Sequence, residues 1–390
     1  MSKMKKAFLL TALLAVLLPL RMSAQMADSA DVYIITCAPG TESYSIYGHT
    51  ALRITIRGTT FDRVYNWGIF DFSTPNFTYR FAKGRLDYML GAYSYEDFLR
   101  EYIAEERSVW SQRLNLTTGE KEKLFELINE NLKPENVKYR YDFFFDNCAT
   151  RVRDIVAAAA TDTVIFPVTE KRKQKSFRRL VDPNQKVLPW LDLGADMLLG
   201  LQADKKASPA DEMFLPVHLM NNMLKTVIIH DGAEEPLTGP AEVVAEFTSS
   251  GKPGARVWVP QTVFYLVLIL VLLITFVFGK PKLERVTDFV LYFIYSVIAL
   301  LLVFTNLFSE HDALHFNLLF LGINILIPVL FISLFTSSNA VMMTRIAFFI
   351  SLSWLPVSII AGQGINPAII PLVLIIMVRL FSRCRFGKKL

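Results

Sequence analysis

Five apolar runs in the last third of the chain constrain its fold more than any other feature. They cover residues 258–278, 289–307, 316–334, 346–361 and 369–380. A transmembrane helix needs about 20 apolar residues, so the first three runs have full spanning length and the last two come close to it. Hydrophobic residues make up 52% of the chain, which is too many for one ordinary soluble domain. The sequence therefore predicts an all-α transmembrane bundle of about five helices over residues 256–390.

Basic residues in the loops predict the orientation of this bundle. Lys280, Lys282 and Arg285 follow the first run, whereas the next loop, residues 308–315, contains no Lys or Arg. Arg345 lies in the third loop, and the C-terminal tail is again basic. Cytoplasmic loops carry an excess of Lys and Arg. The pattern thus places the preceding domain outside the cytoplasm and the C-terminus inside it.

The first 24 residues have the features of a signal peptide. Three lysines precede an apolar run that is short for a membrane span, and Met22-Ser23-Ala24 resembles a cleavage site. An uncleaved anchor is the alternative. We predict a multi-pass protein of a bacterial inner membrane, whose mature chain starts at Gln25. The net charge of +5 is modest and partly terminal, so nucleic acid is not an expected partner.

Residues 25–255 have the pattern of a periplasmic α+β domain. Residues 32–35, 51–57 and 63–69 are predicted strands. Thr117-Thr118-Gly119-Glu120 begins a predicted helix, and a second begins near Asn147. Residues 204–254 are rich in Pro, Gly and charge, so we expect a partly ordered linker that leads into the membrane.

A histidine followed by a cysteine is the main chemical signal of this domain. Cys148 falls in the first turn of the second helix, where Asp146 or Asn147 can cap the backbone. Backbone N–H groups and the helix dipole favour a thiolate there. A cysteine nucleophile needs a base, and His49, after Gly48, is the best candidate.

Simpler interpretations of the same residues stay open. Cys37 and Cys148 share the oxidising compartment and could form a disulfide, whereas Cys384 is predicted to face the cytoplasm. A single histidine beside a strand is also often structural. The order of His before Cys along the sequence suggests a nucleophile and its base but does not by itself identify an active site.

Longer motifs carry a family resemblance. These are YGHTALRI (47–54), VYNWGIFDFSTPNFTYRFAKGRLDYML (64–90) and FFFDNCATRVRD (143–154), followed by FLPVHLM (214–220) and FSEHDALHFNLLFLGINIL (308–326). Together they closely resemble the Lnb family, lipoprotein N-acyltransferases of Bacteroidota. The resemblance spans nearly the whole mature chain, and the long aromatic motif is its most specific part.

The resemblance implies a circularly permuted papain-like (NlpC/P60-like) fold with Cys148 as nucleophile and His49 as base. A third polar group should orient the imidazole, and the candidates are Asn66, Asp62 and Asp71. The aromatic residues of the shared motifs are expected to lie in the core more often than against substrate. They are Tyr47, Tyr65, Trp67, Phe70 and Phe77.

The activity that the resemblance implies is acyl transfer without a cofactor. Cys148 would take an acyl chain from a membrane phospholipid as a thioester. The α-amine of the N-terminal diacylglyceryl-cysteine of a diacylated lipoprotein would then accept it, with His49 transferring protons. Phospholipid, diacylated lipoproteins and the membrane are therefore the expected partners.

Two histidines outside this domain allow two interpretations. His311 and His315 lie four residues apart beside Glu310 and Asp312, a spacing that could bind a metal. The resemblance instead assigns His311 and Asn317 to a family motif at the membrane surface, and we predict no metal. With Tyr47, His311 and Asn317 are candidates for positioning substrate.

Three other functions compete with this prediction. Permuted papain-like domains also cleave cell-wall peptides and amides, so a membrane-anchored cysteine peptidase or amidase is the first. A non-enzymatic membrane assembly factor with a Cys37–Cys148 disulfide is the second. A transporter is the weakest, because five spans without an internal repeat and with almost no intramembrane charge do not suggest a transport pathway.

Overall fold

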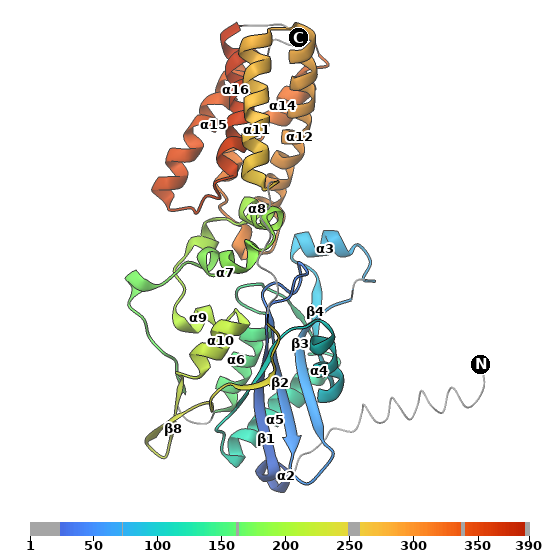
Figure 1. Cartoon of the computed structure of the whole chain (residues 1–390), viewed down its shortest axis with the longest axis vertical. Helices are drawn as coiled ribbons and strands as arrows, with labels where there is room; N and C mark the ends of the chain where they lie inside the picture. The colour runs from blue at the N-terminus through green and yellow to red at the C-terminus, as the bar shows by residue number, and fades with distance from the viewer. Residues whose placement is uncertain (1–23, 72, 161–163, 249–257, 337–339, 387–390) are drawn as a thin grey trace, which may run out of the picture.

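The computed structural model describes residues 24–71, 73–160, 164–248, 258–336 and 340–386. Figure 1 shows an α+β domain at one end of the long axis and a helical bundle at the other. The predicted α+β class and C-terminal helical region are confirmed. Most of the predicted signal peptide lies outside the described residues.

A seven-stranded sheet forms the frame of the α+β domain. Its order is β10-β5-β1-β2-β3-β4-β6, and every neighbouring pair is antiparallel. The strands are β1 (Ala30–Cys37), β2 (His49–Ile56), β3 (Asp62–Ile69), β4 (Asp87–Ser94), β5 (Val109–Arg113), β6 (Lys138–Arg140) and β10 (Glu242–Ala245). The three strands predicted from alternation correspond to β1, β2 and β3.

Helices cover both faces of this sheet because side chains alternate along β1 and β2. Val32 and Leu52 point to one face, where they join a core with Val152 of α6 (Cys148–Ala159). Helices α5 (Thr118–Leu132) and α2 (Ala24–Ser29) pack on the same side. On the other face, Ile35 and Val64 pack with residues of α4 (Tyr95–Ala104). The sheet thus lies between two layers of helices.

The predicted start of α5 is confirmed in detail. The Thr117 hydroxyl accepts the Glu120 N–H at 3.3 Å, and the Glu120 carboxylate accepts the Thr117 N–H at 2.8 Å. This reciprocal capping box satisfies backbone donors that the first helical turn leaves without partners.

The partly ordered linker expected over residues 204–254 is wrong for most of its length. Helices α9 (Pro209–Glu212) and α10 (Pro216–Met223) and strands β8 (Val227–His230) and β9 (Ala233–Pro236) fill it, and β10 completes the main sheet. Strand β7 (Val164–Ile165) pairs with β8. Although this segment is rich in Pro and charge, its prolines start helices α9 and α10, where their fixed φ is favourable.

Four short helical elements lie between the sheet and the bundle. Helices α7 (Phe177–Gln185) and α8 (Pro189–Leu198) follow the first 3₁₀ turn, η1 (Lys171–Lys173), and a second 3₁₀ turn, η2 (Leu201–Asp204), comes after them. Figure 1 shows α7 and α8 directly below the bundle. Helix α3 (Phe77–Lys83) approaches the bundle separately.

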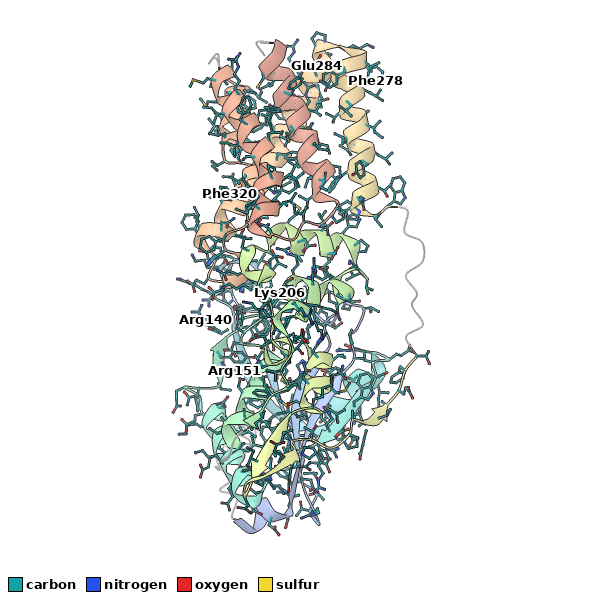
Figure 2. The ribbon with its side chains drawn as sticks, turned by 90° about the vertical axis from the view of Figure 1, so that its left-hand side faces the viewer. Arg140, Arg151, Lys206, Phe278, Glu284 and Phe320 are labelled. Carbon is teal, nitrogen blue, oxygen red and sulfur yellow. The ribbon has the colours of Figure 1, made fainter. Side chains whose placement is uncertain are left out.

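The bundle contains α11 (Pro260–Leu273, continued by the π-helical turn Ile274–Phe278), α12 (Pro281–Phe308), α13 (Leu319–Gly322), α14 (Leu326–Ser333), α15 (Val341–Ala361) and α16 (Ile369–Phe386). Among the described residues, three helices are long and apolar enough to cross a membrane: Pro260–Phe278, Pro281–Phe308 and Val341–Ala361. Figure 2 places Phe278 and Glu284 at the far end of the bundle and Phe320 at the end nearer the α+β domain.

The third predicted span, residues 316–334, is divided rather than continuous. Helices α13 and α14 are separated at Asn324, whose side-chain amide donates to Ala347 O at 3.1 Å and Ser351 Oγ at 3.0 Å. Its carbonyl oxygen accepts the Leu326 N–H at 3.2 Å. A broken helix is tolerated at membrane depth where neighbouring helices satisfy its backbone in this way. Hydropathy detects the apolar run but not the break.

Candidate active site

Cys148 occupies the first residue of α6, and a network of caps fixes it there. Asn147 is the N-cap: its side-chain oxygen accepts the N–H groups of Ala149 and Thr150, both at 2.9 Å. Its amide nitrogen donates to Phe143 O at 2.9 Å and to Phe214 O at 2.8 Å. The capping amide therefore connects α6 to both aromatic motifs that flank the cysteine, and it holds the thiol at a helix N-terminus.

His49 is the first residue of β2 and lies opposite Cys37 of β1. The preceding Gly48 has φ +84°, and a Cβ there would lie 2.7 Å from the Cys37 carbonyl oxygen. Only glycine combines this backbone conformation with such a close approach. Gly48 therefore lets the chain turn sharply and present the His49 ring beside Cys148.

Asn66 is the third candidate that the structure brings to this pair. Its Oδ1 lies 2.6 Å from His49 Nε2, and its Nδ2 donates to the Tyr93 hydroxyl. The bond to Tyr93 orients the amide with its oxygen toward the imidazole. Nε2 then carries the proton, which leaves His49 Nδ1 to exchange a proton with the thiol. The result is a Cys–His–Asn arrangement.

The electrostatics favour an ion pair between cysteine and histidine. Burial raises the pKa of the Cys148 thiol, but the charge and hydrogen bond of His49, with the N–H groups of Thr50 and Ala149, lower it by more. Burial lowers the pKa of His49, but the Cys148 thiolate and hydrogen bonds to Cys148 and Asn66 raise it by more. A thiolate beside an imidazolium is the state of a ready nucleophile.

Asp62 and Asp71, the other two candidates, lie elsewhere. Asp62 forms a bidentate pair with Arg53, at 2.8 and 2.6 Å. Asp71 is exposed and accepts the N–H and hydroxyl of Ser73. Neither carboxylate contacts His49 in the hydrogen bonds and ion pairs of the described residues.

Cys37 is a second thiol next to the site, but its environment is different. It is fully buried, and both Cys37 and Cys148 are free. Burial raises the pKa of Cys37 strongly, and the nearby Arg107 guanidinium only partly offsets this. Cys37 is therefore a protonated core thiol behind the His49 strand, whereas Cys148 is partly accessible.

The sequence does not reveal which residues support the segment before His49. The Tyr47 hydroxyl accepts a hydrogen bond from Gln185 of α7 at 2.9 Å, and Asn184 donates to Ile46 O at 2.6 Å. Tyr47 also packs on Phe143, with ring centroids 4.6 Å apart. Gln185 and Asn184 lie outside the quoted motifs, and only the fold reveals their role.

His311 and Asn317 lie where the α+β domain meets the bundle. His311 Nε2 is 2.8 Å from Phe81 O of α3, and His315 Nε2 is 2.9 Å from Ser309 O. Glu310 pairs with Arg85 at 2.5 Å. Asn317 is fully buried, and its amide donates to Met197 O at 2.7 Å. These side chains connect the two regions of the protein, and both imidazoles use Nε2 on backbone carbonyls.

An aromatic strip extends from the cysteine toward the bundle, and we define it as Tyr141, Tyr88, Phe70 and Phe77. The successive ring centroids are 4.2, 5.1 and 5.9 Å apart. Tyr141 lies close enough to Cys148 for the thiolate to raise its pKa, after the larger effect of burial. Phe77 begins α3, and Tyr79 of the same helix faces Phe304 of α12 at 6.4 Å.

The remaining motif aromatics divide between core and site. Tyr65 and Trp67 are buried in the main core, whereas Tyr47, Phe70 and Phe77 are half-buried. Gly68, with φ +97°, forms a bulge in β3, and a Cβ there would lie 3.5 Å from that of Cys148. The bulge allows β3 to pass close to the nucleophile.

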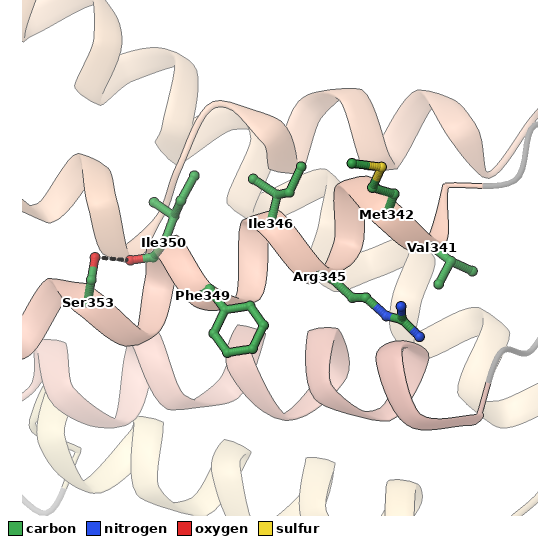
Figure 3. A pocket seen from close by; sticks show the side chains of 7 residues that line it. All are labelled: Val341, Met342, Arg345, Ile346, Phe349, Ile350 and Ser353. Carbon is green, nitrogen blue, oxygen red and sulfur yellow. Dashed lines mark hydrogen bonds between the residues drawn. The ribbon is translucent and has the colours of Figure 1, made fainter.

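A recess of about 870 Å³ does not belong to this site. Figure 3 shows that side chains of α15 line it, including Arg345, Phe349 and Ser353. It is a shallow apolar surface on the side of one bundle helix, and it contains none of the candidate catalytic residues.

Comparisons with known proteins agree with the two-part architecture. Residues 22–176 match the Lnb N-terminal periplasmic domain, and residues 252–390 match the Lnb transmembrane domain. No curated protein and no solved structure matches the chain. The first match contains Cys148, His49 and Asn66, and the second contains the bundle with His311 and Asn317. The chain is thus a membrane protein with a periplasmic N-terminal domain, and it belongs to the Lnb family.

Proposed function

We propose that this protein is a lipoprotein N-acyltransferase that uses Cys148 as its nucleophile. The observation that carries the proposal is the Cys148–His49–Asn66 arrangement in a protein anchored in the membrane. His49 contacts Asn66 at 2.6 Å, and its charge lowers the pKa of the partly accessible Cys148 thiol. Membership of the Lnb family supports the same activity.

We further propose that the catalytic domain is a circularly permuted papain-like domain. The supporting features are a nucleophilic cysteine at a helix N-terminus and a histidine from a neighbouring strand. An asparagine on the far ring nitrogen completes the arrangement. In this chain the histidine strand precedes the cysteine helix.

The first step transfers an acyl group to sulfur. The Cys148 thiolate attacks an ester carbonyl of a membrane phospholipid. A C–S bond forms, the ester C–O bond breaks, and the leaving alkoxide takes the proton from the His49 imidazolium as lysophospholipid departs. The resulting thioester retains enough activation for a second transfer.

The second step returns the enzyme to its starting state. The α-amine of a lipoprotein's diacylglyceryl-cysteine attacks the thioester, a C–N bond forms and the C–S bond breaks. Neutral His49 accepts a proton from the amine, which restores the thiolate–imidazolium pair. The reaction consumes neither water nor a cofactor.

The aromatic strip is the feature that favours a lipid substrate over a soluble cell-wall peptide. It joins the surroundings of Cys148 to α3, and α3 contacts α12 of the bundle. Apolar rings can cover an acyl chain that leaves the bilayer. A hydrolase acting on water-soluble peptides has no need for this connection.

We propose five spans with a cytoplasmic C-terminus for the bundle. The divided α13–α14 segment and α16 would complete the three long helices. Ile376 and Leu380 of α16 are fully buried among the other helices. The basic loops described above support this orientation.

The experiment that tests the function is mass spectrometry of an endogenous lipoprotein. Cells that carry the wild-type protein are compared with cells that carry only Cys148→Ser or His49→Ala, with Cys384→Ser as a matched cysteine control. The amide-linked acyl chain should disappear in the first two strains and persist in the control. Purified protein should also release lysophospholipid from labelled phospholipid vesicles.

The competing functions give different results in the same experiments. A cell-wall peptidase or amidase would leave lipoproteins triacylated in the Cys148→Ser strain and would release peptide fragments instead. A non-enzymatic assembly factor would leave lipoproteins triacylated in both strains, and one that depends on a Cys37–Cys148 disulfide would tolerate His49→Ala but not Cys148→Ser. Either result would refute the acyltransferase proposal.

A further inference from the structure

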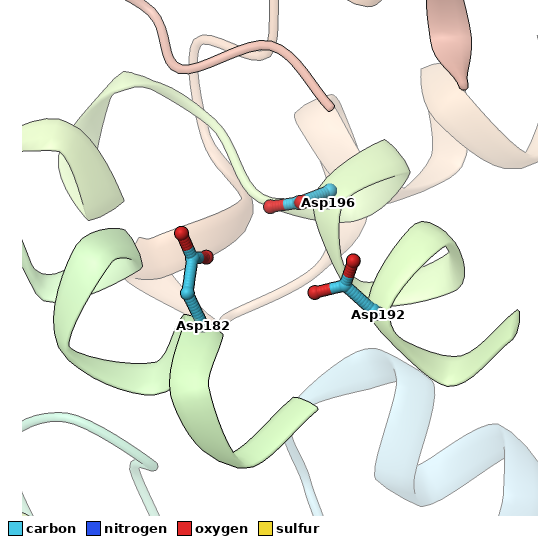
Figure 4. Close-up of side chains that lie close together, drawn as sticks. All are labelled: Asp182, Asp192 and Asp196. Atoms are coloured by element: carbon cyan, nitrogen blue, oxygen red, sulfur yellow. The ribbon is translucent and has the colours of Figure 1, made fainter. Parts of the chain in front are cut away.

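A cluster of three carboxylates lies outside the catalytic site, between the α+β domain and the bundle. Figure 4 shows Asp182 of α7 facing Asp192 and Asp196 of α8. One carboxylate oxygen from each lies within 4.8 Å of those from the other two. They border a cavity of about 400 Å³ whose other wall is the start of α11 and the loop before α16.

Asp192 shows that this cluster is not satisfied by the protein alone. The residue is only 8% exposed, and its Oδ1 has no hydrogen-bond partner among the described residues. Its Oδ2 accepts a hydrogen bond from Asn366 at 2.9 Å. A buried carboxylate oxygen without a partner is unfavourable. It is also free to bind a ligand in the cavity that it borders.

The charge around the cavity leaves room for a cation. Four carboxylates line it, against three basic side chains: Asp182, Asp192, Asp196 and Asp204, against Arg178, Arg179 and Lys186. Arg178 is committed to Asp196 at 2.7 Å and Asp204 at 2.9 Å. The exposed Lys186 lies 3.9 Å from Asp182, a distance at which it can move away at little cost.

We propose that Asp182, Asp192 and Asp196 bind a Ca²⁺ ion in this cavity. Ca²⁺ takes oxygen ligands at about 2.3–2.6 Å, so ligands on opposite sides of the ion are about 4.6–5.2 Å apart. Oxygens within 4.8 Å of one another are close enough for one ion to contact all three after small side-chain movements. Mg²⁺ needs shorter bonds, of about 2.0–2.1 Å. Water would supply the remaining ligands.

The proposed ion would act on the position of the catalytic domain. Asn366, in the loop before α16, donates to Asp192 at 2.9 Å and to Asp196 at 3.0 Å, so the ligands already contact the bundle. Helix α7, which carries Asp182, also donates from Gln185 to the Tyr47 hydroxyl at 2.9 Å and from Asn184 to Ile46 O at 2.6 Å. The ion would therefore tie the bundle to the segment that carries His49.

The test uses the full-length protein in detergent, stripped with a chelator. Ca²⁺ should raise the Tm of the wild-type protein, since a ligand that binds only the folded state stabilises it. Tb³⁺ luminescence should appear on binding and be lost on adding Ca²⁺ but not equimolar Mg²⁺. This measurement is independent of acyl transfer, so it stands or falls separately from the proposed function.

Variants give the decisive comparison. Asp192→Asn and Asp182→Asn should each weaken Ca²⁺ binding by about tenfold or more, whereas Asp154→Asn, an exposed carboxylate on α6, should bind as the wild type does. A Tm that is equal in Ca²⁺ and chelator would overturn the proposal. So would an unchanged Ca²⁺ affinity in Asp182→Asn, whose partly exposed side chain makes misfolding unimportant.

Discussion

At the scale of single residues, the candidate catalytic site depends on hydrogen bonds that orient two side chains. Asn147 and the turn before α6 fix Cys148, while Gly48 and Asn66 fix His49. The sequence predicts the position of Cys148, because an N-cap residue directly precedes its helix. The sequence cannot predict the position of His49, because His49 and Asn66 meet only when β2 pairs with β3.

Asn66 should act as a positioning residue. Asn66→Ala removes one hydrogen bond to a charged imidazolium, a loss of about 1.5–3 kcal/mol. We therefore expect kcat to fall about 10- to 100-fold, with the alkaline limb of the pH profile displaced to lower pH. Asp71→Ala, at an exposed carboxylate of the same motif, should leave both kcat and the profile unchanged. A similar loss in both variants would contradict this role.

The Cys148–His49 ion pair should give a bell-shaped pH dependence. Activity should fall on the acid side as the thiolate is protonated, and on the alkaline side as the imidazolium loses its proton. His49→Ala removes the charge that outweighs burial, so the pKa of Cys148 should rise. Alkylation of Cys148 by iodoacetamide, followed against pH in a Cys384→Ser background, measures this shift. An unchanged alkylation profile would show that the pair is not coupled.

At the scale of elements, the bundle holds a charged network that hydropathy did not anticipate. Arg379 of α16 is 1% exposed and bonds Asp288 of α12 at 2.6 Å and the Thr275 hydroxyl of the π-helical turn at 2.6 Å. Glu284 lies 3.5 Å from the same guanidinium. In the sequence, Arg379 is one of several basic residues of the C-terminal tail, and the sequence does not show which residues a charged side chain pairs with.

Breaking this network should be strongly destabilising. Arg379→Gln removes the more buried of the two arginines that bind Asp288, while Arg383 remains at 3.2 Å, so the loss should be up to about 3–5 kcal/mol. Arg345→Gln is the control, because Arg345 is an exposed arginine of α15. The free energy of unfolding of this variant should stay within about 0.5 kcal/mol of that of the wild type. Unfolding of the full chain in mixed detergent–denaturant micelles compares the two. Equal stability of the two variants would show that the network contributes little.

The sequence predicts individual elements better than their connections. Strands β1 to β3, helix α5 and the start of α6 follow from alternation and capping, which are local signals. The sequence does not predict the break at Asn324 or the order of residues 204–247, because long-range contacts determine both. Asn324 is satisfied by α15, and β10 is ordered by pairing with β5.

At the scale of the whole molecule, the two regions are joined through several small contacts. Gly200, close to the end of α8, lies against the backbone of the loop that follows α12. Its N–H donates to Ala313 O at 2.8 Å, and a Cβ at this position would lie 1.9 Å from His315 O. Asn317 bonds Met197 O on the same side. The α+β domain is thus held against the bundle by backbone fit together with apolar contacts, since Leu193 belongs to the core of the bundle and Ala313 packs with Leu199.

Gly200→Ala should loosen this junction. The added methyl group meets backbone rather than a flexible side chain, so the interface must shift, at about 1–3 kcal/mol. Gly194→Ala, within α8 and with no atom within 4 Å of its Cβ, should be neutral or stabilising by up to about 1 kcal/mol. Limited proteolysis and the Tm of both variants measure the difference. Similar proteolysis rates in both would show that the fit at Gly200 is unimportant.

Helices α7 and α8 lie between the sheet and the bundle, and this layer has a consequence for the proposed reaction. The separation between the α+β domain and the bundle is set by the packing of the protein itself. A lipid donor of the proposed acyl transfer would then have to leave the hydrocarbon in part, and each methylene exposed to water would cost about 0.8 kcal/mol. The proposed enzyme should therefore react faster with ester carbonyls close to the headgroup than with carbonyls placed deeper along the acyl chain.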